Sequence, residues 1–131
     1  MQGNFSPASS LVKLEHRAPI DWLLKQDARI RETLPTWANI GSGSDHLPGL
    51  AQMLGILQEA FANIGADRPQ STVTPTPAGG IFNLRCRPEA SFRVLLSGHY
   101  DTVFGPDHPF RQCRWLKPDV LSGPGVVDMK G

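Results

Sequence analysis

The strongest constraint on the fold is a change in the spacing of apolar residues midway along the chain. In the first part, apolar residues recur at intervals of three and four, the period of an amphipathic helix that faces a core. These residues are Leu50, Met53, Leu54, Leu57, Phe61 and Ile64. Strand-like segments follow at 71–76 and 81–87, and the wholly apolar run 94–96 is typical of a strand covered on both faces. Helices followed by strands, one of them buried, predict an α/β sandwich.

An earlier helix is expected from Ile20 onward. Pro19 suits the first helical position, where its missing N–H is not needed. Pro35 is expected to end or kink this helix, because proline removes a backbone donor and clashes with the preceding turn. Residues 1–18 are interpreted as a loose arm, and residues 19–131 as one domain.

Turn and cap residues mark the limits of other elements. Ser44 or Asp45 is placed to cap the start of the central helix, and Gly65 stands where a glycine often ends one. The turn residues 117–119 lie between two apolar pairs, which predicts a β-hairpin within 113–121.

Composition excludes several classes of function. The 131 residues carry a formal charge of +1 and no basic run, so no nucleic-acid partner is expected. No apolar stretch approaches the roughly 20 residues that span a bilayer, so no membrane partner is expected either. The two cysteines, Cys86 and Cys113, are too few for a disulfide framework and are interpreted as buried reduced thiols. Without a signal-peptide pattern at its start, the chain is expected to be cytoplasmic.

The first chemically informative segment is Ser97-Gly98-His99-Tyr100-Asp101-Thr102-Val103, directly after the apolar run. Side chains two positions apart on an extended backbone share a face, so His99 and Asp101 are expected to point the same way. A neutral imidazole binds zinc well, and a carboxylate can hold its second nitrogen. The same spacing also fits a half-buried histidine bonded to a turn aspartate, the more common origin of such a short motif.

The second segment is Gly123-Pro124-Gly125-Val126-Val127-Asp128-Met129-Lys130-Gly131. Glycines permit a tight backbone path that brings a carboxylate close to an ion, and one carboxylate can bridge two metals. A simple turn and a phosphate-binding nest are the alternatives for this loop. Pro124 weakens the second alternative, because it removes a backbone donor that such a nest would use.

Together, the two segments resemble the paired signatures of the zinc-dependent carboxypeptidase and deacylase family. This family includes glutamate carboxypeptidase, acetylornithine deacetylase, succinyl-diaminopimelate desuccinylase and the aminoacylases. The resemblance extends from about Ile20 to Gly131, and residues 39–44 also look like part of the family's N-terminal segment. The Gly-Pro-Gly of the second segment is closest to the glutamate carboxypeptidase branch. Residues 19–131 are accordingly expected to be the incomplete N-terminal part of a zinc-peptidase-like catalytic domain, an α/β fold with a mixed sheet flanked by helices.

The resemblance implies a role for each motif residue. His99 would bind one zinc ion, Asp128 would bridge two, and Asp101 would orient the His99 ring as part of the catalytic machinery. The cofactor would be two Zn²⁺ ions, with Co²⁺ or Mn²⁺ as alternatives. The peptide bond after Asp128 would be cis. Tyr100 would point away from the motif residues and pack.

The resemblance also implies the reaction, hydrolysis of an amide bond next to a carboxylate-bearing residue. Its substrates would be N-acyl amino acids or peptides, and a complete enzyme could form a homodimer. A general-base glutamate and the remaining metal ligands would follow Gly131, so the chain alone is expected to be inactive and to bind zinc weakly. The alternative is a non-catalytic binding or scaffold module derived from the same family.

Overall fold

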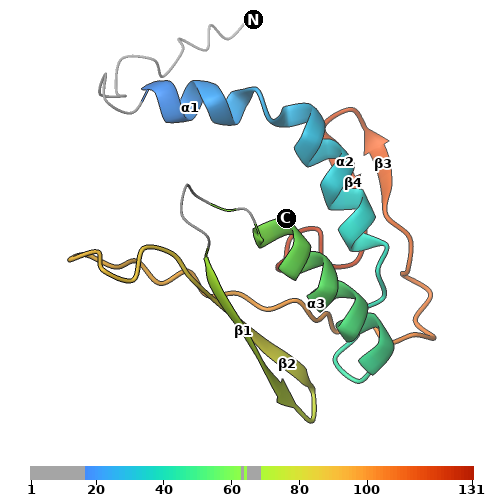
Figure 1. The fold of residues 1–131 in the computed structure, drawn as a ribbon. Helices are drawn as coiled ribbons and strands as arrows, with labels where there is room; N and C mark the ends of the chain where they lie inside the picture. Colours follow the sequence, from blue (N-terminus) through green and yellow to red (C-terminus); the bar gives the residue numbers. More distant parts are fainter. Residues whose placement is uncertain (1–16, 63, 65–68) are drawn as a thin grey trace, which may run out of the picture. The chain divides into compact units, whose positions relative to one another are not determined.

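The computed structural model describes residues 17–62, 64 and 69–131. It divides into two units, Met1–Thr33 and Leu34–Gly131, and each is described by itself. Most of the expected N-terminal arm and the expected cap Gly65 lie outside the described residues. The elements in order are α1 (Arg17–Leu24), α2 (Asp27–Ala38), α3 (Leu47–Phe61), β1 (Gln70–Thr76), β2 (Gly79–Arg85), β3 (Arg114–Lys117) and β4 (Val120–Ser122) (Figure 1).

Two helices occupy the region where one was predicted. Helix α1 ends at Leu24, and the backbone N–H of Gln26 donates to the Leu23 carbonyl at 2.9 Å, a bond that tightens the last turn. A new helix then begins at Asp27, whose carboxylate suits the positive end of the helix dipole. Helix α1 also starts two residues before Pro19, which the first turn accepts because its N–H groups have no intrahelical partner.

Pro35 was predicted to end or kink its helix, and it does not end it. Pro35 lies inside α2, and the Pro35 carbonyl still accepts a bond from the Asn39 backbone N–H at 3.0 Å. The helix therefore loses one donor at the proline and continues to Ala38, which is fully buried.

Helix α3 supplies two of the four buried hydrophobic residues found among the described residues. Leu50 and Met53 are each 1% exposed, as the helical spacing predicts. The predicted cap is wrong, however, because the N-cap residue is His46 and makes no side-chain cap bond. Ser44 instead bonds to a distant part of the chain, as described below.

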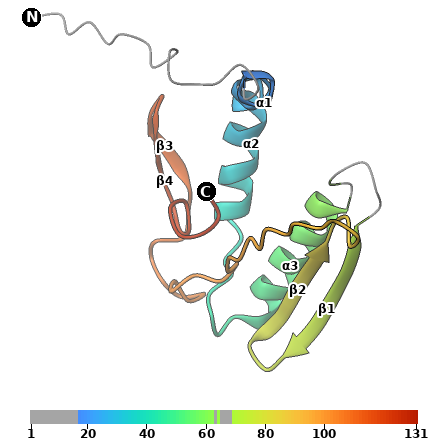
Figure 2. The same ribbon diagram turned by 90° about the vertical axis from the view of Figure 1, so that its left-hand side faces the viewer.

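The hairpin β1–β2 packs against α3 through β2 (Figure 2). The strands are antiparallel, with Val73 opposite Phe82, and the rings of Phe61 and Phe82 lie 6.4 Å apart between helix and strand. Both predicted strands are confirmed. Tyr100 adds a further link, because its hydroxyl donates to the Gly80 carbonyl at 2.7 Å and accepts from the Gly80 N–H at 2.9 Å.

The second hairpin, β3–β4, is also confirmed. Trp115 pairs with Leu121, and the turn falls at Pro118-Asp119 as the sequence predicts. A register irregularity between Trp115 and Lys117 accommodates the short connection.

The predicted buried strand at 94–96 is wrong. Val94, Leu95 and Leu96 are 71%, 88% and 89% exposed and lie outside any strand. Within the described residues, the strands form two separate two-stranded antiparallel sheets and no mixed sheet. The architecture is thus a small α/β arrangement, in which no described residue covers this apolar run. Cys86, expected to be buried, is exposed, and both cysteines are free thiols.

None of the helices within the described residues has the length and apolar character that crossing a bilayer demands.

Candidate functional site

The site begins where two distant segments meet. Gly43 and Thr102 form an isolated parallel bridge, supported by Thr102 N–H donating to the Ser42 carbonyl at 2.8 Å. The Ser42 hydroxyl donates to the Tyr100 carbonyl at 2.7 Å. Because Ser42 is fully buried and Thr102 is 6% exposed, these contacts fix the path of the chain just after His99.

His99 lies between two carboxylates. Its Nδ1 is 3.0 Å from Asp101 Oδ1, and its Nε2 is 2.9 Å from Asp128 Oδ1. The predicted pairing of His99 and Asp101 is therefore present, and the structure also brings Asp128 to the other ring nitrogen. Two of the predicted site residues, Asp101 and Asp128, therefore contact the imidazole of the third, His99.

Ser44 is a site residue that the sequence did not reveal. Its hydroxyl donates to Asp101 Oδ2 at 2.6 Å, while Asp101 Oδ1 faces His99. The two oxygens of one carboxylate are thus fixed by different partners, which sets the plane of the Asp101 side chain. A serine just before a helix is usually interpreted as its N-cap. The sequence therefore did not indicate that Ser44 bonds to Asp101 instead.

The loop that carries Asp128 is held by Lys130. Lys130 is 8% exposed, and its Nζ donates to the carbonyls of Ile40 at 2.8 Å and Trp37 at 3.0 Å, at the C-terminal end of α2. Lysine is favourable there because the last carbonyls of a helix carry partial negative charge. Gly125 has a φ of +74°, and its carbonyl accepts from the Lys130 N–H at 2.9 Å. The sequence assigned no role to Lys130.

The peptide bond between Asp128 and Met129 is cis, as the resemblance implied.

Electrostatics follow from these contacts. The Asp128 carboxylate hydrogen-bonded to His99 is the main cause that raises the pKa of the imidazole above its usual value, and Asp101 adds to the effect. The hydrogen bond from Ser44 is the main cause that lowers the pKa of Asp101, with His99 contributing in the same direction. The arrangement therefore favours a positively charged group between the two carboxylates.

The same atoms suit a metal ion. Two ligands about 2.0–2.1 Å from a tetrahedral zinc ion are separated by about 3.3 Å, close to the 2.9 Å between His99 Nε2 and Asp128 Oδ1. The bond between Asp101 and His99 Nδ1 is the carboxylate–histidine contact that orients metal-bound imidazoles. Within the residues that the structure describes, no group of three or more His, Cys, Asp or Glu side chains could hold a metal. The described residues therefore fit part of a metal centre and supply too few ligands for a whole one.

A hollow of about 320 Å³ adjoins these groups. His99, Asp101 and Asp128 form its polar side. The apolar side chains that complete the lining are Val103, Phe104, Phe110, Val126 and Val127. A molecule in this hollow would meet the site on one side and apolar surface on the other.

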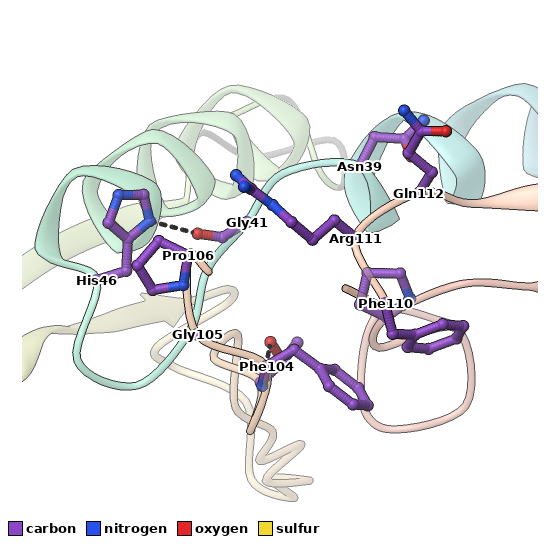
Figure 3. A pocket seen from close by; sticks show the side chains of 11 residues that line it. Asn39, Gly41, His46, Phe104, Gly105, Pro106, Phe110, Arg111 and Gln112 are labelled. Atoms are coloured by element: carbon purple, nitrogen blue, oxygen red, sulfur yellow. Dashed lines mark hydrogen bonds between the residues drawn. The ribbon is translucent and has the colours of Figure 1, made fainter. Parts of the chain in front are cut away.

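His46 and His108 have partners outside this cluster. His46 is half-buried and donates from Nδ1 to the Gly41 carbonyl at 2.6 Å (Figure 3). His108 stacks near Phe104, with ring centroids 4.9 Å apart. His16 lies outside the described residues.

Comparisons with known proteins assign no family. No protein-family model matches the chain, no curated protein matches it, and no solved structure matches it. The resemblance to zinc-dependent hydrolases therefore rests on the two motif segments themselves.

Proposed function

We propose that this chain contributes metal ligands to a zinc-dependent amide hydrolase of the glutamate carboxypeptidase and deacylase type. The observation that carries the proposal is the position of His99, with one ring nitrogen on Asp101 and the other directed at Asp128. A histidine held in this way presents Nε2 and a carboxylate oxygen to the same point. A histidine nitrogen and a carboxylate oxygen are common ligands in zinc sites.

Each residue has a distinct task in the proposed site. His99 and Asp128 would be the metal ligands, and Asp101 would keep the His99 proton on Nδ1 so that Nε2 stays free to bind. Within the described part of the chain, the second carboxylate oxygen of Asp128 has no hydrogen-bond partner, so it is free for a second ion. Bound zinc would supply Lewis-acid activation of an amide carbonyl and of a water molecule.

The proton transfer requires a group that the site does not contain. No glutamate lines the hollow among the described residues, and Asp101 is already engaged by Ser44 and His99. A general base and further ligands must therefore come from residues other than those described. For this reason the described residues are expected to hydrolyse no amide by themselves.

The experiment uses the product of the whole reading frame that encodes this chain. Purified protein is loaded with Zn²⁺ and assayed for amine release from a panel of N-acyl amino acids and dipeptides. We expect zinc-dependent hydrolysis that falls at least about 1,000-fold in His99→Ala and Asp128→Ala, because each removes a ligand.

His108→Ala is the matched control, because it removes an imidazole that contacts neither His99 nor Asp128. Activity within about twofold of wild type is expected for it. Absence of hydrolysis across the panel, or activity that survives His99→Ala, would contradict the proposal. The first of these results would favour the non-catalytic scaffold alternative.

A further inference from the structure

The distance between His99 and Asp128 decides whether one ion can bind both side chains. His99 Nε2 and Asp128 Oδ1 lie 2.9 Å apart and are joined by a hydrogen bond. A bound metal ion would replace the proton of that bond, because it binds through the same two atoms. The two side chains are 48% and 78% exposed, so little else packs against them. Neighbouring parts of the chain must therefore keep them at the distance that one ion requires.

On one side of this ligand pair, Thr102 meets Gly125. A β-carbon on Gly125 would lie 3.1 Å from Thr102 Cγ2, so the two segments approach closely there. Thr102 follows His99 by three positions, and Gly125 precedes Asp128 by three positions. A contact on one side alone leaves the two segments free to pivot about it. A second contact, on the other side of the pair, is needed to set the distance between the ligands.

Gly98 and Met129 make that second contact. Gly98 directly precedes His99, and Met129 directly follows Asp128. A β-carbon on Gly98 would lie 2.8 Å from Met129 Cε, well inside the roughly 3.5–4.0 Å of an ordinary carbon contact. Among the described residues, it would meet no other atom within 4 Å apart from those of its chain neighbours. The φ of Gly98 is not positive, so the close approach of Met129 is what favours glycine there.

We propose that Met129 is a positioning residue, which sets the distance between His99 and Asp128 by lying against Gly98. Its effect on metal affinity rests on the proposed function, whereas the contact itself does not. Cε is the end of a flexible side chain, so a small group added at Gly98 displaces the methyl and leaves the backbone in place. Met129 is also 45% exposed. The contact can therefore be removed without unfolding the chain.

The test measures Zn²⁺ affinity and stability in the same variants. The dissociation constant is taken from the ¹⁵N shift of His99 Nε2 as Zn²⁺ is added, and urea unfolding reports stability. Met129→Ala is expected to weaken Zn²⁺ binding about tenfold, as the loss of a group that positions metal ligands does. Met129→Leu keeps an apolar side chain of similar volume and is expected to stay within about threefold of wild type.

A double-mutant cycle isolates the contact. Gly98→Ala is expected to weaken Zn²⁺ binding about tenfold in the wild-type background and less than about twofold in the Met129→Ala background, where the displaced methyl is absent. The urea midpoint of Gly98→Ala is expected to stay within about 0.5 M of wild type, because only a side-chain end moves. Gly55→Ala is the control, since a β-carbon there meets nothing within 4 Å, and its Zn²⁺ affinity should change less than about twofold.

The possible results separate this proposal from the proposed function. Unchanged affinity in Met129→Ala, or an equal effect of Gly98→Ala in both backgrounds, would overturn the positioning role and leave the metal site standing. A fall in stability that parallels the fall in affinity would show a merely structural role and overturn it too. If wild-type His99 does not respond to Zn²⁺, the proposed function is contradicted, and the Nε2 shift in EDTA decides the role of Met129. A shift change in Gly98→Ala that Met129→Ala cancels would then support that role, and no change would overturn it.

Discussion

The Ser44 hydroxyl donates to Asp101 Oδ2 at 2.6 Å, across 57 positions of sequence. This contact leaves Asp101 Oδ1 to hold His99, so a residue outside both motif segments controls the orientation of the imidazole. The candidate site is thus built from three places in the chain: the turn before α3, the segment 97–103 and the loop 123–131.

Removing the Ser44 hydroxyl tests this control. In Ser44→Ala the pKa of Asp101 is expected to rise toward its ordinary value, because the main cause that lowers it is gone. Zinc affinity is expected to fall about 10-fold or more, in the range found when partners of metal ligands are removed. NMR titration of the Asp101 carboxyl carbon measures the first effect, and Ser91→Ala is the control. An unchanged Asp101 pKa would contradict this role for Ser44.

Lys130 is expected to stabilise the second unit through its bonds to the α2 carbonyls. Lys130→Met keeps the apolar stem and removes the charged donor to the Trp37 and Ile40 carbonyls, which then keep only their backbone donors. We expect a loss of about 1–3 kcal/mol in the free energy of unfolding, measured with urea. The exposed Lys25→Met is the control and is expected to lose less than about 0.5 kcal/mol. Equal stability of the two variants would show that the Lys130 bonds contribute nothing.

The same lysine gives the unfolding free energy a pH dependence. Burial lowers the pKa of Lys130 from 10.5 to about 8. Between these values the unfolded chain binds more protons than the folded one, so stability should rise as pH increases from about 8 to 10.5. Below about pH 8 Lys130 is charged in both the folded and the unfolded chain, so the full free-energy cost of burying its charge is present. Lys130→Met should lack this rise, which urea unfolding across that pH range can detect.

Zinc binding is expected to depend on pH through His99. The raised pKa of His99 means that a proton competes with the metal up to a pH above 6.5, so affinity should increase as pH rises through that value. Without metal, the protonated His99 stabilises the fold below pH 6.5, and this contribution is lost as pH rises through the raised pKa. Asp128→Asn removes the largest cause and should move the transition to lower pH. Zinc calorimetry of the unaltered protein from pH 5.5 to 8.5 measures the first effect, and NMR titration of the His99 imidazole in metal-free Asp128→Asn measures the second. An unchanged His99 transition in that variant would contradict the role of Asp128.

The exposed run 94–96 leads to a contrasting prediction. Leu95→Ser should change the free energy of unfolding by less than about 0.5 kcal/mol, because Leu95 is 88% exposed. Leu50→Ala should cost about 2–5 kcal/mol, because Leu50 is 1% exposed in the core. A cost for Leu95→Ser similar to that for Leu50→Ala would mean that this run is covered, as its sequence suggested.

Local patterns predicted the parts of the fold that depend on neighbouring residues. The spacing of Leu50 and Met53 identified the core face of α3, and the turn at 117–119 identified the second hairpin. The run 94–96 was misinterpreted because apolar residues favour burial only where another element is present to cover them. The sequence of the run does not show whether such an element is present. The first of the two outcomes predicted for Pro35, an end to the helix, does not occur because a helix can lose one donor and continue.

The sequence likewise predicted only the part of the candidate site that depends on neighbouring residues. The spacing of His99 and Asp101 predicted their pairing, because an extended backbone places them on one face. The contact of Asp128 with the same imidazole follows from long-range folding, and the proximity of the two segments was inferred only from the family resemblance. Ser44 and Lys130 could not be assigned, since their partners lie 57 and 90 or more positions away and leave no local signal.

The most direct test of the central claim is an NMR titration of the imidazole nitrogens with Zn²⁺, a method that detects weak as well as tight binding. Our account predicts that His99 Nε2 responds selectively, that His46 and His108 do not, and that Asp128→Asn weakens the response about tenfold or more. A uniform response of all histidines, or an unchanged response of His99 in Asp128→Asn, would contradict a metal site formed by His99 and Asp128.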